Sequence, residues 1–277
     1  MNMDDIEESS NVDDRRRNSS SGGRGLPSIG TMFMLWPIVK PLIRSKFGLV
    51  IIALGGLAWF SGFNPLSLVG AGGASSSSHV NKVKDDKEAH FIKKVLASTE
   101  DVWTKILAQH NIHYTKPVLV LFRGATRSGC GTAKSEMGPF YCPADKKVYL
   151  DLGFFDDLAR KHNAPGDFAQ AYVLAHEVGH HVQDLQGTLN KVQHMKQSWG
   201  GRKNSKSNAL QVRVELQADC YAGIWAHHAQ HQFHILQKGD VAEALNAASS
   251  IGDDTLERQA TGSVRQIVSL MVLLNSV

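Results

Sequence analysis

Three side chains in one short segment could together bind a metal ion and move a proton. They are His176, Glu177 and His180, in the sequence Ala-His-Glu-Val-Gly-His. Residues four apart on an α-helix lie on the same face, so both histidines can reach one ion while Glu177 points beside it. This spacing is typical of a zinc protease, in which the glutamate is the general base. The competing interpretation is a surface helix with incidental histidines.

A catalytic zinc usually has three protein ligands, so a third is expected elsewhere. A third histidine at position 186 after a glycine at 183 is excluded, because the chain has Gln183 and Gln186. Glu215 and Asp219 lie four apart in an apolar helical stretch, where buried carboxylates are costly unless they are paired or bind a metal. We predict Glu215 as the third ligand and Asp219 as the hydrogen-bond partner of a histidine ligand; Asp219 as the ligand is the alternative.

Helices and strands must position these residues. The site helix is predicted to start with Asp167 as its N-cap and to stop at Gly187. Apolar residues at helical spacing predict a packing helix over residues 85–109. β-branched and aromatic runs predict strands at 117–122 and 147–152. We expect the second strand to be an edge with which an extended peptide substrate pairs, although an internal strand is the alternative.

Other histidines have weaker indications of function. His181 lies about 100° round the helix from His180, so it is expected to support the site or face solvent rather than bind the ion. A further group of histidines is interpreted as an exposed helical surface: His227, His228, His231 and His234.

Five segments together resemble the bacterial putative neutral zinc metallopeptidase family, over roughly residues 80–264. They are Gly129–Gly131, the second strand, His176–His181, Glu215–Trp225 and Gly239–Asn246. The family is similar to the gluzincins. The resemblance implies zinc bound by His176, His180 and Glu215, catalysis by Glu177, and orientation of His176 by Asp219. It also implies a helix-rich, zincin-like α+β domain with a small β-sheet.

The region before this domain has a different composition. Residues 1–39 are mostly polar and are predicted to be a disordered tail. No charged residue occurs from Phe47 to Val80, and the apolar run that continues to Val69 could cross a bilayer core of about 30 Å. We therefore expect one transmembrane helix within residues 40–70, followed by a linker at 71–84 and the metallopeptidase domain at 85–264. Cleavage of the apolar segment as a signal peptide is the competing outcome.

Basic residues before the apolar run indicate the orientation of the chain. Lys40, Arg44 and Lys46 precede it, which favours a single-pass protein with a cytoplasmic N-terminus and a periplasmic or extracellular domain. In that oxidising space Cys130 and Cys142 could form a disulfide, whereas in the reverse orientation they would be thiols. The net charge of +4 is spread along the chain, so no nucleic-acid partner is expected.

The C-terminus departs from the family after Val264. With permissible codons, a shifted reading frame through Arg265–Val277 encodes a sequence similar to the family continuation. We therefore interpret residues 265–277 as an aberrant tail produced by a frameshift. The resemblance implies that the lost segment would carry a cysteine able to pair with Cys220, so its loss would leave Cys220 unpaired.

These observations predict a zinc-dependent peptidase that acts on a peptide or protein substrate. Zn²⁺ is the expected cofactor, and Glu177 would assist the attack of a zinc-bound water on the peptide carbonyl. The alternative is a catalytically inactive, membrane-anchored envelope protein that binds zinc. The altered C-terminus favours this alternative, whereas the presence of Glu177 opposes it.

Overall fold

The computed structural model describes residues 1–17, 82–161, 166–200 and 205–259. The predicted transmembrane region at 40–70 and the tail at 265–277 lie outside these residues, as does most of the predicted linker at 71–84. Within the described part of the chain, no helix is both long enough and apolar enough to cross a membrane.

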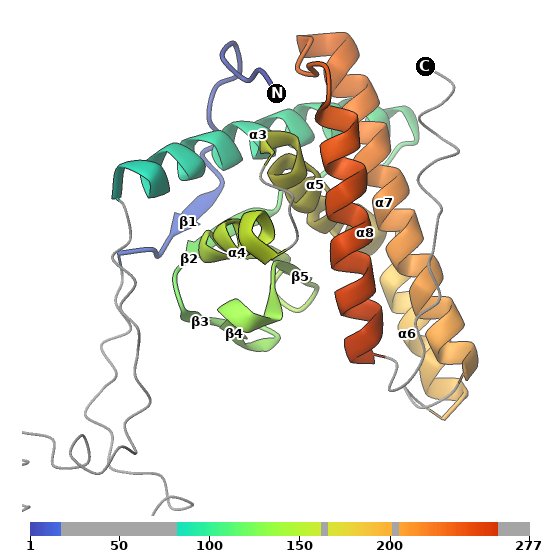
Figure 1. Cartoon of the computed structure of the whole chain (residues 1–277). Coiled ribbons are helices and arrows are strands. Elements are labelled where there is room, and N and C mark those ends of the chain that lie inside the picture. The colour runs from blue at the N-terminus through green and yellow to red at the C-terminus, as the bar shows by residue number, and fades with distance from the viewer. Residues whose placement is uncertain (18–81, 162–165, 201–204, 260–277) are drawn as a thin grey trace, which may run out of the picture. The chain divides into compact units, whose positions relative to one another are not determined.

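Four short strands form the main sheet, in the order β1-β2-β6-β5 (Figure 1). Their bounds are Val12–Asp14 for β1, Val118–Phe122 for β2, Lys147–Asp151 for β6 and Phe140–Cys142 for β5. β1, β2 and β6 are parallel, whereas β5 runs antiparallel to β6. Leucines and valines of β2 and β6 are buried on both faces of the sheet, which explains their continuous apolar runs. A separate hairpin consists of β3, Ala125–Ser128, and β4, Gly131–Lys134, and a short 3₁₀ turn at Ser135–Met137 follows it.

The prediction that the strand at 147–152 is an edge strand is wrong. β6 has a neighbour on each side, since Val148 pairs with Leu119 of β2 and with Tyr141 of β5. The edge on this side of the sheet is β5. A three-residue strand is too short to show an alternating pattern, and this is why the sequence did not reveal it.

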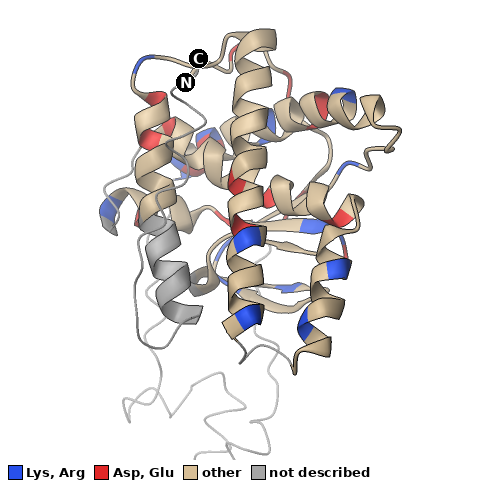
Figure 2. Ribbon diagram, turned by 90° about the vertical axis from the view of Figure 1, so that its right-hand side faces the viewer, with Lys and Arg blue, Asp and Glu red and all other residues tan. Residues whose placement is uncertain are grey.

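Helices make up most of the described chain. They are α3 at Lys82–Gln109, α4 at Gly153–Lys161, α5 at Asp167–Leu185, α6 at Thr188–Ser198, α7 at Ser205–Phe233 and α8 at Asp240–Gln259. Figure 2 shows Lys and Arg interspersed with Asp and Glu along them. Helix α5 packs against α3, α7 and α8. The predicted helix-rich α+β fold with a small sheet is confirmed.

Trp225 joins three of these helices. Its side chain on α7 is fully buried and stacks on Phe168 of α5, with ring centroids 6.1 Å apart. Its indole N–H donates to the hydroxyl of Ser98 on α3 over 3.0 Å. Because a buried indole needs a hydrogen-bond acceptor, Ser98 satisfies the tryptophan within an apolar core.

The ends of α5 agree only partly with the sequence prediction. The helix begins at Asp167, but the N-cap residue is Gly166, so the predicted N-cap role of Asp167 is wrong. In the first turn its carboxylate instead interacts favourably with the helix dipole. Gly187 follows the C-cap residue and has a φ of 75°, a left-handed conformation that ends the helix.

The prediction of a disordered tail is wrong for residues 1–17. Met3 and Ile6 are buried in the main core, and residues 12–14 form strand β1 of the sheet. The hydroxyl of Ser9 and the side-chain amide of Asn11 both donate to Glu100 of α3. Composition suggested disorder because the segment is polar on average, but a few apolar residues and specific partners in distant helices hold it.

Candidate metal centre

Helices α5 and α7 approach closely at Gly179 and Ala218. A Cβ atom on Gly179 would lie 2.9 Å from the carbonyl oxygen of Ala218 and 3.3 Å from Cβ of Tyr221. Such a contact with backbone cannot be relieved by turning a side chain, so glycine allows the short separation. The crossing brings the middle of α5 against the turns of α7 that carry Glu215 and Asp219.

Three potential metal ligands converge beside this crossing. His176 and His180 come from α5 and Glu215 from α7, and one ligand atom from each lies within 4.8 Å of the others. Oε2 of Glu215 is 3.4 Å from Nε2 of His176 and 3.2 Å from Nε2 of His180. Among the described residues this is the one such group of three or more His, Cys, Asp or Glu side chains.

The spacing of these atoms fits a zinc ion. Ligands that lie 2.0–2.1 Å from a tetrahedral Zn²⁺ are about 3.3 Å from one another. The two separations from Glu215, 3.4 and 3.2 Å, agree with that value, and all three ligand atoms lie within 4.8 Å of one another. Two imidazole nitrogens and one carboxylate oxygen are also a donor set of catalytic zinc sites, and they leave a fourth position open.

Asp219 orients His176. Nδ1 of His176 lies 2.8 Å from Oδ1 of Asp219, so the ring donates its Nδ1–H to the carboxylate and directs Nε2 toward Glu215. The hydroxyl of Tyr172 donates to the same carboxylate oxygen. Asp219 is therefore held from two turns of α5, and the tautomer of His176 suits metal binding through Nε2.

Gln183 has the corresponding position beside His180, a contact that was not predicted from the sequence. Its Nε2 donates to the carbonyl oxygen of Val214 over 2.8 Å and to Oε1 of Gln217 over 2.9 Å. Because a carbonyl can only accept, Oε1 of Gln183 must face His180, whose Nδ1 donates to it over 2.9 Å. A polar residue one turn after the second histidine of the motif is the signal that could have indicated the contact.

Hydrogen bonds give this cluster unusual protonation behaviour. Burial opposes protonation of His176, but hydrogen bonds to Asp219 and Glu215 outweigh it and raise its pKa to about 10. The pKa of His180 is also raised, since the bond to Glu215 and nearby negative charge overcome burial. Burial favours the neutral form of Glu215, yet bonds from both histidines lower its pKa well below the usual range. The carboxylate thus stays charged and attracts positive charge to the point where the ligands meet.

Glu177 is next to His176 on α5 and is only 8% exposed. Its negative charge contributes to the raised pKa of both His176 and His180. The structure therefore places a buried carboxylate beside the ligand group.

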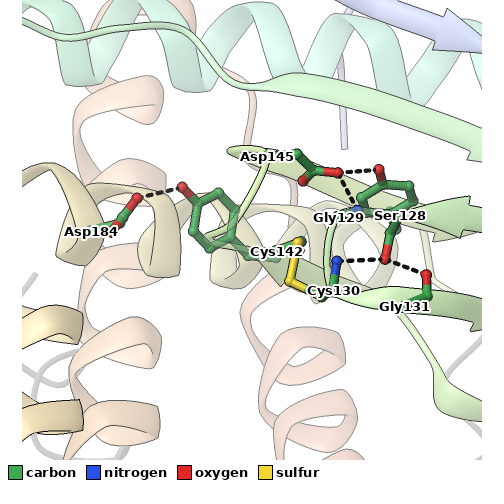
Figure 3. Close-up of a disulfide and its surroundings, with 9 residues drawn as sticks. Ser128, Gly129, Cys130, Gly131, Cys142, Asp145 and Asp184 are labelled. Atoms are coloured by element: carbon green, nitrogen blue, oxygen red, sulfur yellow. Dashed lines mark hydrogen bonds between the residues drawn. A yellow bond between two sulfur atoms is a disulfide. The ribbon is translucent and has the colours of Figure 1, made fainter.

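Cys130 and Cys142 form a disulfide that fastens β5 to the turn between β3 and β4 (Figure 3). The neighbouring residue in β5, Tyr141, donates its hydroxyl to Asp184 of α5 over 2.9 Å. The edge strand is thus tied to the hairpin at one residue and to the site helix at the next. Cys220 on α7 is a free, partly buried thiol.

His181 is completely buried and belongs to the junction of α5 with the sheet rather than to the ligand group. Its Nε2 donates to the carbonyl oxygen of Thr115 over 2.6 Å, and its Nδ1 lies 3.1 Å from the hydroxyl of Tyr141. Burial lowers the pKa of His181. It thus helps to hold the edge strand against α5.

The histidines at 227, 228, 231 and 234 are exposed; the first three are on α7, and His234 follows its end. The rings of His227 and His231 lie 4.5 Å apart. They are distinct from the group at Glu215, which lies three turns earlier on the same helix.

Comparison with known proteins agrees with this geometry. The sequence profile of a family described as "Putative neutral zinc metallopeptidase" matches residues 1–266. "Uncharacterized protein YpfJ" of Escherichia coli strain K12 is 44% identical over 259 residues, which cover 93% of this chain and 85% of that protein. "Uncharacterized protein Rv2575" of Mycobacterium tuberculosis strain H37Rv is 42% identical over 175 residues, or 60% of this chain and 56% of the relative. No solved structure matches.

Proposed function

This chain belongs to the putative neutral zinc metallopeptidase family, and from that premise we propose that it hydrolyses peptide bonds at the group formed by His176, His180 and Glu215. The observation that carries the proposal is the buried Glu177 beside a group of three potential ligands. A site that only stabilises the fold has four protein ligands and does not use a general base.

The residues of the chain divide the work of the reaction. His176, His180 and Glu215 would hold Zn²⁺, which when bound polarises the peptide carbonyl and makes water more acidic. Glu177 accepts a proton from the attacking water and afterwards delivers it to the leaving amine. Asp219 and Gln183 keep the Nδ1 atoms of the two histidines protonated, so that both Nε2 atoms stay directed at the ion.

The edge strand β5 is the proposed partner of the substrate backbone. It pairs with β6 on one side, and Tyr141 connects it to the site helix through Asp184. An extended peptide can add to the free side of such an edge by main-chain hydrogen bonds. The disulfide and the bond to Asp184 would keep β5 in place while the peptide binds.

Replacement of Glu177 by Gln tests the proposal. The amide keeps the size of the side chain but cannot accept the proton, so we expect kcat to fall by about 10²–10⁴-fold while zinc content stays at that of the parent. The matched control is Glu7→Gln, which changes an exposed glutamate. Zinc content would be measured by elemental analysis, and hydrolysis with a peptide library.

Two results would count against catalysis. Equal hydrolysis by Glu177→Gln and the parent would remove the assigned role of Glu177. Stoichiometric zinc in the parent without cleavage of any library peptide would instead favour a zinc-binding protein that is not a peptidase.

A further inference from the structure

The N-terminal segment of residues 1–17 is an integral part of the folded body. Strand β1 pairs with β2 in parallel, with Val12 opposite Leu119. The amide of Leu119 donates to the carbonyl of Asn11 over 2.9 Å, and the amide of Arg15 donates to Leu121 over 2.7 Å. Strand β1 therefore covers one edge of β2, so the main sheet depends on residues that precede the apolar stretch in the sequence.

Contacts outside the sheet hold the same segment. Met3 and Ile6 are buried in the core that α3 and α5 share. The α-amino group of Met1 lies 3.1 Å from Oε1 of Gln237 and 3.3 Å from the carboxylate of Asp240, at the start of α8. The first residue of the segment thus contacts the last helix of the body.

Charge pairs join residues just before position 18 to residues just after position 81. Arg16 lies 2.8 Å from Asp85, and the two side chains are 7% and 10% exposed. Arg17 lies 3.6 Å from Asp86. Arg16 also pairs with Asp14 and Asp86, and Asp85 also pairs with Arg123. Because a buried charge is costly without partners, these groups stabilise one another as a network. The last described residues before position 18 and the first turns after position 81 therefore meet at one place.

We propose that residues 1–17 and the body from residue 82 onward lie on the same side of the membrane. A single crossing between residues 17 and 82 would put β1 and β2 on opposite sides and leave Asp85 without Arg16. The proposal thus departs from the expected single-pass arrangement with a cytoplasmic N-terminus and a periplasmic or extracellular domain.

Cross-linking in intact membranes tests this topology. Arg17→Cys and Asp86→Cys would be introduced together into the full chain, in a Cys220→Ser background that removes the free thiol. The side chains at 17 and 86 are 72% and 34% exposed, so both changes are expected to leave folding intact. A short, membrane-permeant bis-maleimide should join the two cysteines, and mass spectrometry should detect the linked peptides.

The matched control pairs Arg17→Cys with Asp101→Cys. Asp101 is exposed on the same helix, α3, and a rise of 1.5 Å per residue puts it roughly 22 Å from Asp86, too far for the linker. Linked peptides from the 17/86 pair and none from the 17/101 pair support the proposal. It is overturned when the 17/86 pair gives none although each single cysteine reacts with a monofunctional maleimide.

An impermeant maleimide gives an independent readout. Applied to intact cells, it should label the single cysteines at 17 and 86 both or neither, because the two positions share a compartment. Labelling of one position with protection of the other would place them on opposite sides and contradict the proposal.

Discussion

Gln183 accepts a hydrogen bond from Nδ1 of His180 over 2.9 Å, within the buried interface of α5 and α7. The same side chain donates to the carbonyl oxygen of Val214, the residue before Glu215. One neutral amide thus fixes the tautomer of a histidine ligand and the position of the helix turn that carries the third ligand. Asp219 supports His176 in the opposite direction, from α7 to α5.

Gln183→Met tests this coupling. Methionine keeps the length of the side chain, but its thioether is only a weak acceptor for His180 and cannot donate to Val214. We therefore expect zinc affinity to fall by about 10–100-fold. Competition with a chelator would measure the affinity, and the absorption spectrum of the cobalt-substituted protein would report a change in ligand geometry. The control is Gln193→Met, at an exposed position of α6. Unchanged affinity and spectrum in Gln183→Met would show that Gln183 does not position His180.

Gly179→Ala should separate α5 from α7. The added Cβ would meet the backbone of Ala218 at 2.9 Å, and we expect overpacking to lower the free energy of unfolding by about 1–3 kcal/mol. Gly223→Ala is a matched control, because a Cβ there meets nothing within 4 Å, and alanine in a helix should add about 0.5–1 kcal/mol. Denaturant unfolding measures both variants. Equal stability of the two would mean that α5 and α7 do not depend on glycine at their crossing.

The sequence predicts those parts of the site that depend on local spacing. His176 and His180 are one helical turn apart, as are Glu215 and Asp219, so each pair can be placed on one face of a helix without knowledge of the fold. Contact between α5 and α7 depends on tertiary packing, but carboxylates in an apolar stretch indicated that Glu215 and Asp219 need a partner.

Other features could not be derived because they depend on residues distant in the chain. Strand β1 has only three residues, and its partner β2 lies more than a hundred residues later. The neutral side chain of Gln183 has no costly charge that would demand a partner. Buried His181 looks like any polar helical residue until Thr115 and Tyr141 pack around it.

Removal of the disulfide should destabilise the protein. Cys130 and Cys142 are 12 residues apart, and closure of a loop of about that length contributes up to roughly 3 kcal/mol to stability. We expect the double variant Cys130→Ser/Cys142→Ser to unfold at lower denaturant and to have a raised KM, because β5 loses its link to the hairpin. Zinc affinity should stay unchanged, since α5 and α7 carry the ligands. Cys220→Ser is the control for loss of a thiol, and equal stability of all three proteins would exclude a structural role of the disulfide.

Zinc should stabilise the folded chain through the His176, His180 and Glu215 group. An ion that binds only the folded state contributes about 4 kcal/mol when its free concentration is about a thousand times Kd. We therefore expect a chelator to lower the Tm of the parent, with recovery when zinc is restored. His176→Ala should lose the response to zinc, whereas His227→Ala, which changes an exposed histidine three turns beyond Glu215 on α7, should keep it. If only His227→Ala lost the stabilisation by zinc, the ion would be bound by the exposed histidines of α7. The group formed by His176, His180 and Glu215 would then contribute no zinc-dependent stability.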